Sequence, residues 1–167
     1  IPPIGRIALN PMLSEKGKLY GDLTASCLSE NHFMVYGSGA AQEMHRRWFE
    51  KYLNGFEVEY TNRSDDYHGL AISGPKSREL LQSLVREDIS NELFKFRDSK
   101  EIFVAGVPAL VNRISFTGEL GYEIYVAPHF QLKLFESLEE AGKEFNLQPF
   151  GSRALMSMRL EKNWGAW

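Results

Sequence analysis

Four charged residues stand at positions where the surrounding pattern favours apolar or neutral side chains. Asp22 and Glu123 interrupt segments typical of strands, and Arg153 and Arg159 lie in a helical segment near the end of the sequence. If these side chains meet in one cleft, the two carboxylates suit a ligand with several N–H donors. An arginine in that cleft would offer a forked donor to a carbonyl or carboxylate of the ligand.

Three aromatic residues would give such a cleft flat walls: Tyr20, Phe116 and Tyr122. A second interpretation explains the same residues without any ligand. The charged side chains would then form structural ion pairs, and the aromatic rings would lie in the hydrophobic core. The residue types and their spacing leave both interpretations open.

The stretch from Arg113 to Val126 must position Glu123 and Phe116. Apolar and polar residues alternate on both sides of Thr117–Gly121, a segment with two glycines and an acid. Period-two alternation is typical of strands, and glycine permits the positive φ that a tight reversal requires. This pattern predicts two strands joined by a turn. On a half-buried strand, Glu123 needs a hydrogen-bond partner unless it faces water.

The remaining periodicity predicts strands and helices in a repeated order. Strands are expected at residues 7–9, 19–27, 32–36, 56–60, 68–72, 101–104 and 107–114. Helices are expected at residues 40–53, after Ser73-Gly74-Pro75, at 129–145, and from an N-cap at Ser152 to about Lys162. This order indicates an α+β fold with largely antiparallel sheets and packed helices.

Composition limits the classes of function. The 167 residues, 43% hydrophobic and 25% charged, suit one globular domain or two small ones sharing a core. A net charge of -3 without a basic block argues against nucleic acid as a partner. No apolar run approaches the roughly 18 residues of a membrane span. We therefore expect neither a nucleic-acid nor a membrane partner.

Cysteine and histidine usage argues against a disulfide or a metal site. Cys27 is the single cysteine and lies in an apolar strand pattern, so it is expected to be buried. The four histidines are scattered, without ligand spacing. The sequence begins with Ile-Pro-Pro and ends Trp164-Gly-Ala-Trp167, which we interpret as part of a longer protein.

Four segments, spread from Gly17 to Glu161, resemble the glycine-cleavage T-protein (aminomethyltransferase) family. Phe116-Thr-Gly-Glu-Leu-Gly-Tyr-Glu-Ile-Tyr125 is similar to the family's Tyr-Thr-Gly-Glu-x-Gly-x-Glu, and Gly17-Lys-Leu-Tyr-Gly-Asp-Leu-Thr24 to its Gly-Gly-x-x-x-Asp-Leu. Leu70-Ala-Ile-Ser-Gly-Pro75 resembles Leu-x-Gly-Pro. Gly151-Ser-Arg-Ala-Leu-Met-Ser-Met-Arg-Leu-Glu161 resembles Gly-x-x-Ala-Arg-Asp-Ser-Leu-Arg-Leu-Glu. Together they cover nearly the whole chain.

The resemblance implies a T-protein-like fold that binds tetrahydrofolate over residues 1–167. It implies that Asp22 is the catalytic aspartate beside the pterin and that Glu123 binds the N–H edge of the pterin ring. Arg153 would contact the folate, and Phe116 and Tyr20 would provide aromatic walls. Phe116 stands where the T-protein motif has tyrosine, so a hydroxyl group is missing there.

The ending Arg159-Leu-Glu-Lys-Asn-Trp-Gly-Ala-Trp167 looks most like the folate domain of sarcosine and dimethylglycine dehydrogenases. The implied function is transfer of a one-carbon unit from an amine or its iminium to tetrahydrofolate. FAD would be bound only by an upstream flavin domain outside this chain, which itself lacks a Gly-x-Gly-x-x-Gly fingerprint. The implied location is the bacterial cytoplasm or the mitochondrial matrix.

Two alternatives remain from the sequence. One is a free-standing aminomethyltransferase that works with a lipoyl carrier. The other is a non-catalytic module that binds folate as a regulatory signal. The retention of Asp22 argues against the non-catalytic module.

Overall fold

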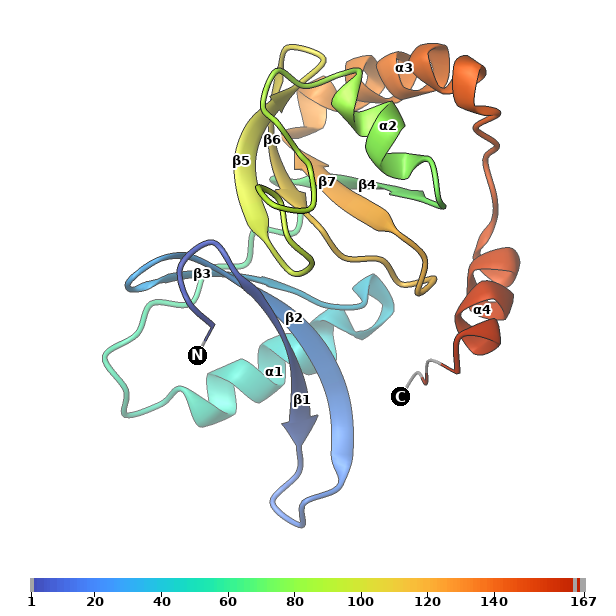
Figure 1. Cartoon of the computed structure of the whole chain (residues 1–167). Helices are drawn as coiled ribbons and strands as arrows, with labels where there is room; N and C mark the ends of the chain where they lie inside the picture. The colour runs from blue at the N-terminus through green and yellow to red at the C-terminus, as the bar shows by residue number, and fades with distance from the viewer. Residues whose placement is uncertain (1, 164, 166–167) are drawn as a thin grey trace. The chain divides into compact units, whose positions relative to one another are not determined.

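The computed structural model describes residues 2–163 and 165, which form two compact units. The first unit runs up to Ser64, and the second begins at Asp65. Figure 1 shows antiparallel strands and helices in both units. The α+β class expected from the sequence is therefore confirmed. Ile1, Trp164 and Trp167, which the sequence interpretation used, lie outside the described residues.

The first unit contains a three-stranded antiparallel sheet in the order β1-β2-β3. Its strands are β1 (Ile7–Leu13), β2 (Leu19–Ser29) and β3 (His32–Tyr36), followed by a 3-10 turn η1 (Gly39–Ala41) and helix α1 (Gln42–Tyr52). Cys27 is buried, as predicted, and its thiol donates to the carbonyl of Ser29.

The strand expected at residues 56–60 is absent, so that prediction is wrong. Phe56, Val58 and Tyr60 alternate with charged residues, yet all three side chains are exposed. The Tyr60 ring stacks on Phe49 of α1, with the ring centroids 5.1 Å apart. Alternation alone does not make a strand, because a strand also needs a neighbouring backbone with which to pair.

The second unit contains a four-stranded antiparallel sheet in the order β4-β7-β6-β5. The strands are β4 (His68–Ser73), β5 (Ser99–Val104), β6 (Val107–Asn112) and β7 (Gly121–Val126). The predicted pairing across the turn is confirmed, because Val111 lies opposite Ile124 and Asn112 opposite Glu123. The connection is longer than predicted and spans residues 113–120.

The second unit also contains three α-helices and two 3-10 turns: α2 (Ser77–Gln82), η2 (Pro128–Phe130), α3 (Gln131–Gly142), η3 (Lys143–Phe145) and α4 (Ser152–Glu161). Ser152 is the first helical residue of α4, and the N-cap is Gly151 without a side-chain hydrogen bond, so the predicted Ser152 cap is wrong. Helix α2 ends at Gln82, and the carbonyl of Leu84, just after the helix, accepts from the amide of Ala105 in the β5–β6 turn.

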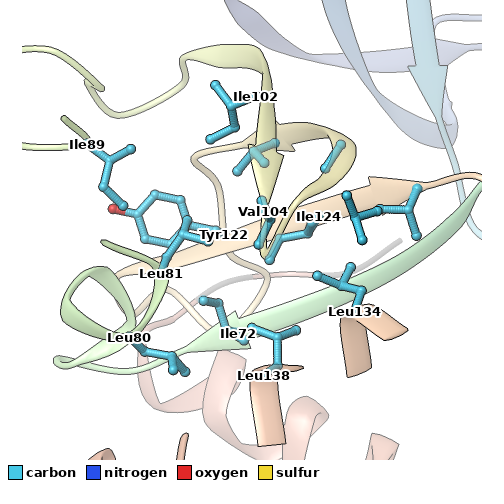
Figure 2. Close-up of a cluster of buried hydrophobic side chains, with 14 of the residues drawn as sticks. Ile72, Leu80, Leu81, Ile89, Ile102, Val104, Tyr122, Ile124, Leu134 and Leu138 are labelled. Atoms are coloured by element: carbon cyan, nitrogen blue, oxygen red, sulfur yellow. The ribbon is translucent and has the colours of Figure 1, made fainter. Parts of the chain in front are cut away.

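One face of the four-stranded sheet forms the core of the second unit. Figure 2 shows side chains of α2 and α3 packed against those of the strands. Tyr122, Ile124 and Val126 of β7 point into this core and are almost completely buried. The alternate residues Glu123 and Tyr125 therefore lie on the opposite face of the sheet.

Candidate functional site

Asp22 lies in the middle of β2, opposite Pro11 of β1, and is half-buried. The described residues form no hydrogen bond with its carboxylate. His45 of α1 is buried close enough to interact with it electrostatically. Burial lowers the pKa of His45, and the negative charge of Asp22 opposes that change. The imidazole that interacts with Asp22 is therefore neutral near pH 7. The carboxylate oxygens of Asp22 remain available as acceptors.

A glycine makes room for this imidazole. A Cβ atom on Gly37 would lie 2.6 Å from His45 Nδ1 and 2.7 Å from Leu23 Cδ2. Such distances are far below van der Waals contact, so any larger residue at position 37 would displace the ring or the strand. Gly37 therefore fixes how closely α1 approaches the strand that carries Asp22.

Tyr20 lies at an irregularity of β2. Gly21 pairs with Met12 and Leu19 with Leu13, which leaves Tyr20 without a pairing partner in β1. Its exposed side chain lines a hollow of about 420 Å³ in the first unit, together with Trp48 and Tyr52 of α1. Asp22 does not line that hollow. Tyr20 and Asp22 therefore share a strand without lining the same hollow.

Glu123 lies on the non-core face of β7 and is half-buried. Among the described residues, Tyr125 donates to its carboxylate, with an Oη–Oε2 distance of 2.8 Å. Burial raises the pKa of Glu123, and the Tyr125 hydrogen bond partly offsets that change. A carboxylate has about four acceptor positions, so capacity remains for further N–H donors.

A cluster of three hydroxyl groups holds the 113–120 loop against β4. Ser73 Oγ lies 2.6 Å from Ser115 Oγ and 2.7 Å from Thr117 Oγ1. The cluster requires glycine at position 121, because a Cβ there would lie 2.7 Å from Ser115 Cβ and 2.8 Å from the carbonyl oxygen of Ile72. The second glycine of the turn thus serves close packing, whereas Gly118 takes a positive φ of 76°.

The outer part of the same loop lies against α4 and the residue that follows it. The guanidinium carbon of Arg159 lies 6.0 Å from the Phe116 ring centroid, within the range of a cation–π contact. Lys162 forms an ion pair with Glu119 at 2.6 Å, and a Cβ on Gly118 would lie 2.7 Å from Lys162 Cγ. The aromatic residue of the loop therefore has a buried arginine beside it.

The structure brings together some of the predicted site residues but not all. Phe116 is joined by Arg159, whereas Arg153 is exposed on the first turn of α4 and touches neither Phe116 nor Glu123 among the described contacts. Tyr122 is fully buried in the core, so it does not form a ligand wall. Asp22 and Tyr20 belong to the first unit, and Glu123, Phe116 and Arg153 belong to the second.

Sequence reasoning missed two partners of the candidate acids. Tyr125, the partner of Glu123, could have been found, since residues two apart on a strand share a face. His45, the neighbour of Asp22, carries no such signal, because its approach depends on how α1 packs against β2 and β3. Within residues 2–163 and 165, no group of three His, Cys, Asp or Glu side chains could hold a metal ion.

The helices within the same described ranges include none with the length and apolar content needed to cross a membrane.

The chain is similar to a dimethylglycine dehydrogenase and to aminomethyltransferases. It is 37% identical to human mitochondrial dimethylglycine dehydrogenase over 170 residues, which cover 100% of this chain and 20% of that protein. It is 36% identical to an aminomethyltransferase from Thermoanaerobacter pseudethanolicus over 151 residues, 90% of this chain and 40% of that enzyme. The chain thus spans between a fifth and two fifths of the length of these relatives.

A solved structure supports the same relationship. The glycine cleavage system aminomethyltransferase T from Bartonella henselae matches with a TM-score of 0.78 and 25% identity, over 97% of this chain and 42% of that chain. The family model for the GCVT N-terminal domain matches residues 2–167. This match covers almost the whole chain, so the protein belongs to the GCVT N-terminal domain family.

Proposed function

We propose that the chain is a tetrahydrofolate-binding domain that takes part in one-carbon transfer from an amine. The observation that carries this proposal is Glu123, a half-buried carboxylate that accepts one described hydrogen bond, from Tyr125. The family membership supports the same reading. A pterin ring presents an amino and an amide N–H on one edge, which matches the unused acceptor positions of this carboxylate.

Tetrahydrofolate would supply the nitrogen atoms that take up the one-carbon unit. In this proposal Glu123 binds and orients the pterin through its N–H edge. Phe116 provides an apolar surface for a flat ring, and its ring is supported by Arg159. Arg153, exposed on α4, is proposed to contact the more polar part of the folate.

Asp22 is proposed as the group that handles the proton. A nitrogen that gains a carbon substituent must lose a proton, and the Asp22 carboxylate can accept it or stabilise a neighbouring cation. The buried His45 beside it is neutral near pH 7, because burial lowers its pKa. The charge of Asp22 is therefore not cancelled by His45.

The dimethylglycine dehydrogenase relative suggests the wider context. That relative matches over the whole of this chain, whereas the aminomethyltransferase matches over 90% of it. We therefore favour a domain that works beside a flavin domain, in which a methylated amine is oxidised to the iminium. The free-standing aminomethyltransferase and the folate sensor remain the competing proposals.

Titration with folinic acid tests the binding proposal directly. Saturable quenching of tryptophan fluorescence is expected for the chain. Glu123→Ala should weaken binding about tenfold to a hundredfold, because a hydrogen bond to a charged group contributes roughly 1.5–3 kcal/mol. Glu101→Ala, an exposed acid on β5, is the matched control and should bind normally. Absence of saturable binding by the unmodified chain would refute the proposal.

The role of Asp22 requires the complete enzyme. Asp22→Asn should retain folinic acid binding while the folate-dependent product disappears. If turnover is unchanged, Asp22 has no part in proton transfer. If Asp22→Asn and Glu123→Ala both keep folinic acid binding and turnover, and only their stability changes, the two acids are purely structural.

A further inference from the structure

Two arginines of the second unit converge on one neutral oxygen. Arg78 Nη2 of α2 and Arg113 Nη2, just after β6, each lie 2.7 Å from Oδ1 of Asn91. An amide oxygen carries no net charge, whereas each guanidinium is positively charged at any physiological pH. The same point in the fold therefore has two cations and an uncharged acceptor between them.

The surrounding contacts hold both guanidinium groups in place. Arg78 Nε donates to the hydroxyl of Tyr122 at 3.2 Å, and Arg113 also donates to the carbonyl of Phe94. Tyr122 and Phe94 are buried core residues, so they anchor the arginines to the rigid part of the unit. Asn91, by contrast, is exposed and reaches the pair from the solvent side.

The positive charge is not neutralised by a direct ion pair. Within the described residues neither Arg78 nor Arg113 forms a salt bridge. The charge of Arg78 repels the guanidinium of Arg113, and the carboxylate of Asp98 attracts it without forming an ion pair with it. Arg113 is half-buried, and this burial lowers the pKa of its guanidinium. Like charges held together and partly desolvated cost free energy that a bound anion would recover.

We propose that Arg78 and Arg113 form a binding site for the oxyanion group of a small molecule, a carboxylate or a phosphate. Both groups present oxygens that match the parallel N–H donors of a guanidinium, and either would displace the Asn91 amide from between the two arginines. This site is built from α2, the 83–98 loop and the end of β6. It shares no residue with the proposed folate site.

Thermal unfolding of the chain in different anions tests the proposal. Inorganic phosphate and acetate serve as probes, at constant ionic strength balanced with chloride. The Tm should rise with the logarithm of the concentration of at least one probe, since a ligand that binds only the folded state stabilises it by mass action. The probe with the larger effect identifies the preferred oxyanion. Equal Tm values in all three anions would overturn the proposal.

Three substitutions make the test specific. Arg78→Gln should abolish the anion-dependent rise in Tm, whereas Arg86→Gln, which removes the same charge from an exposed position, should keep it. Equal loss in both variants would mean general charge screening and would overturn the proposal. Asn91→Asp places a carboxylate between the arginines, so it should raise the Tm by a few degrees and remove the anion response. A lower Tm in Asn91→Asp would contradict the proposal.

Discussion

At the residue scale, the two candidate acids differ in the groups that surround their carboxylates. Asp22 has a buried imidazole as its electrostatic neighbour, and Glu123 has a tyrosine hydroxyl as its donor. Burial raises the pKa of Glu123, so the folded protein holds a proton on it more tightly than the unfolded chain does. Glu123 therefore costs stability whenever it is ionised without a ligand.

The pH dependence of stability follows from this shift. Between the ordinary glutamate pKa of about 4.3 and the raised folded value, the folded state binds more protons, so stability falls as the pH rises. We expect Glu123→Gln to be more stable than the unmodified chain at pH 7, with the difference vanishing below about pH 4. Urea unfolding from pH 4 to 8 measures this. Glu101→Gln is the control, and an equal effect there would contradict the prediction.

Gly37, which packs against His45, and the nearby Gly39 allow a matched test of close packing. Gly37→Ala would force a methyl group into the His45 ring and Leu23, which should cost about 1–3 kcal/mol of unfolding free energy. A Cβ on Gly39, two residues away, has no atom within 4 Å. Because both changes affect the unfolded chain alike, the difference between them reports the clash. Equal stabilities in urea unfolding would mean that Gly37 has no packing role.

At the scale of elements, the local sequence pattern predicted the pairing of strands that are adjacent in sequence. The β6–β7 pairing follows from alternation on both sides of a glycine-containing segment, and the structure confirms it. The missing strand at 56–60 could not be predicted from local pattern, because Tyr60 stacks on Phe49 of α1 and the segment pairs with no described strand. The burial of Arg159 beside Phe116 also results from tertiary packing, which the spacing of residues does not reveal.

The apolar residues of helix α3 differ in how deeply the structure buries them. Leu134 and Leu138 are buried in the core, whereas Phe135 is 42% exposed. Leu138→Ala should cost about 2–5 kcal/mol by opening a cavity. Leu132→Ala on the same helix, where the side chain is 67% exposed, should change stability by less than about 0.5 kcal/mol. Thermal unfolding of both variants measures the contrast. Similar losses of stability in the two variants would show that α3 does not bury Leu138 in preference to Leu132.

At the scale of the whole molecule, the chain has two units with separate sheets. The residues of the main hydrophobic cluster, from Ile72 to Leu138, all lie in the second unit. The sequence alone indicates either one domain or two small ones. Composition cannot distinguish these two possibilities, because the number of domains depends on which strands share a sheet.

The self-contained core predicts that the second unit folds without the first. A fragment starting at Asp65 should show cooperative thermal unfolding and a dispersed amide NMR spectrum, because its core loses no member of the cluster. The corresponding fragment ending at Ser64 lacks that cluster and serves as the comparison. A broad, non-cooperative transition in the fragment from Asp65 would show that its core depends on the rest of the chain.

The position of β4 beside β7 sets an order of events during folding. Ile72 pairs with Tyr122, about fifty positions away, whereas β5, β6 and β7 follow one another in sequence. Since the entropy lost on loop closure grows with loop length, the local hairpins should form before β4 joins them. Ile72→Val should then mainly accelerate unfolding, and Ile102→Val should slow folding. Until β4 arrives, β7 is an open edge, so the nascent chain is most prone to mispairing along the strand that carries Glu123.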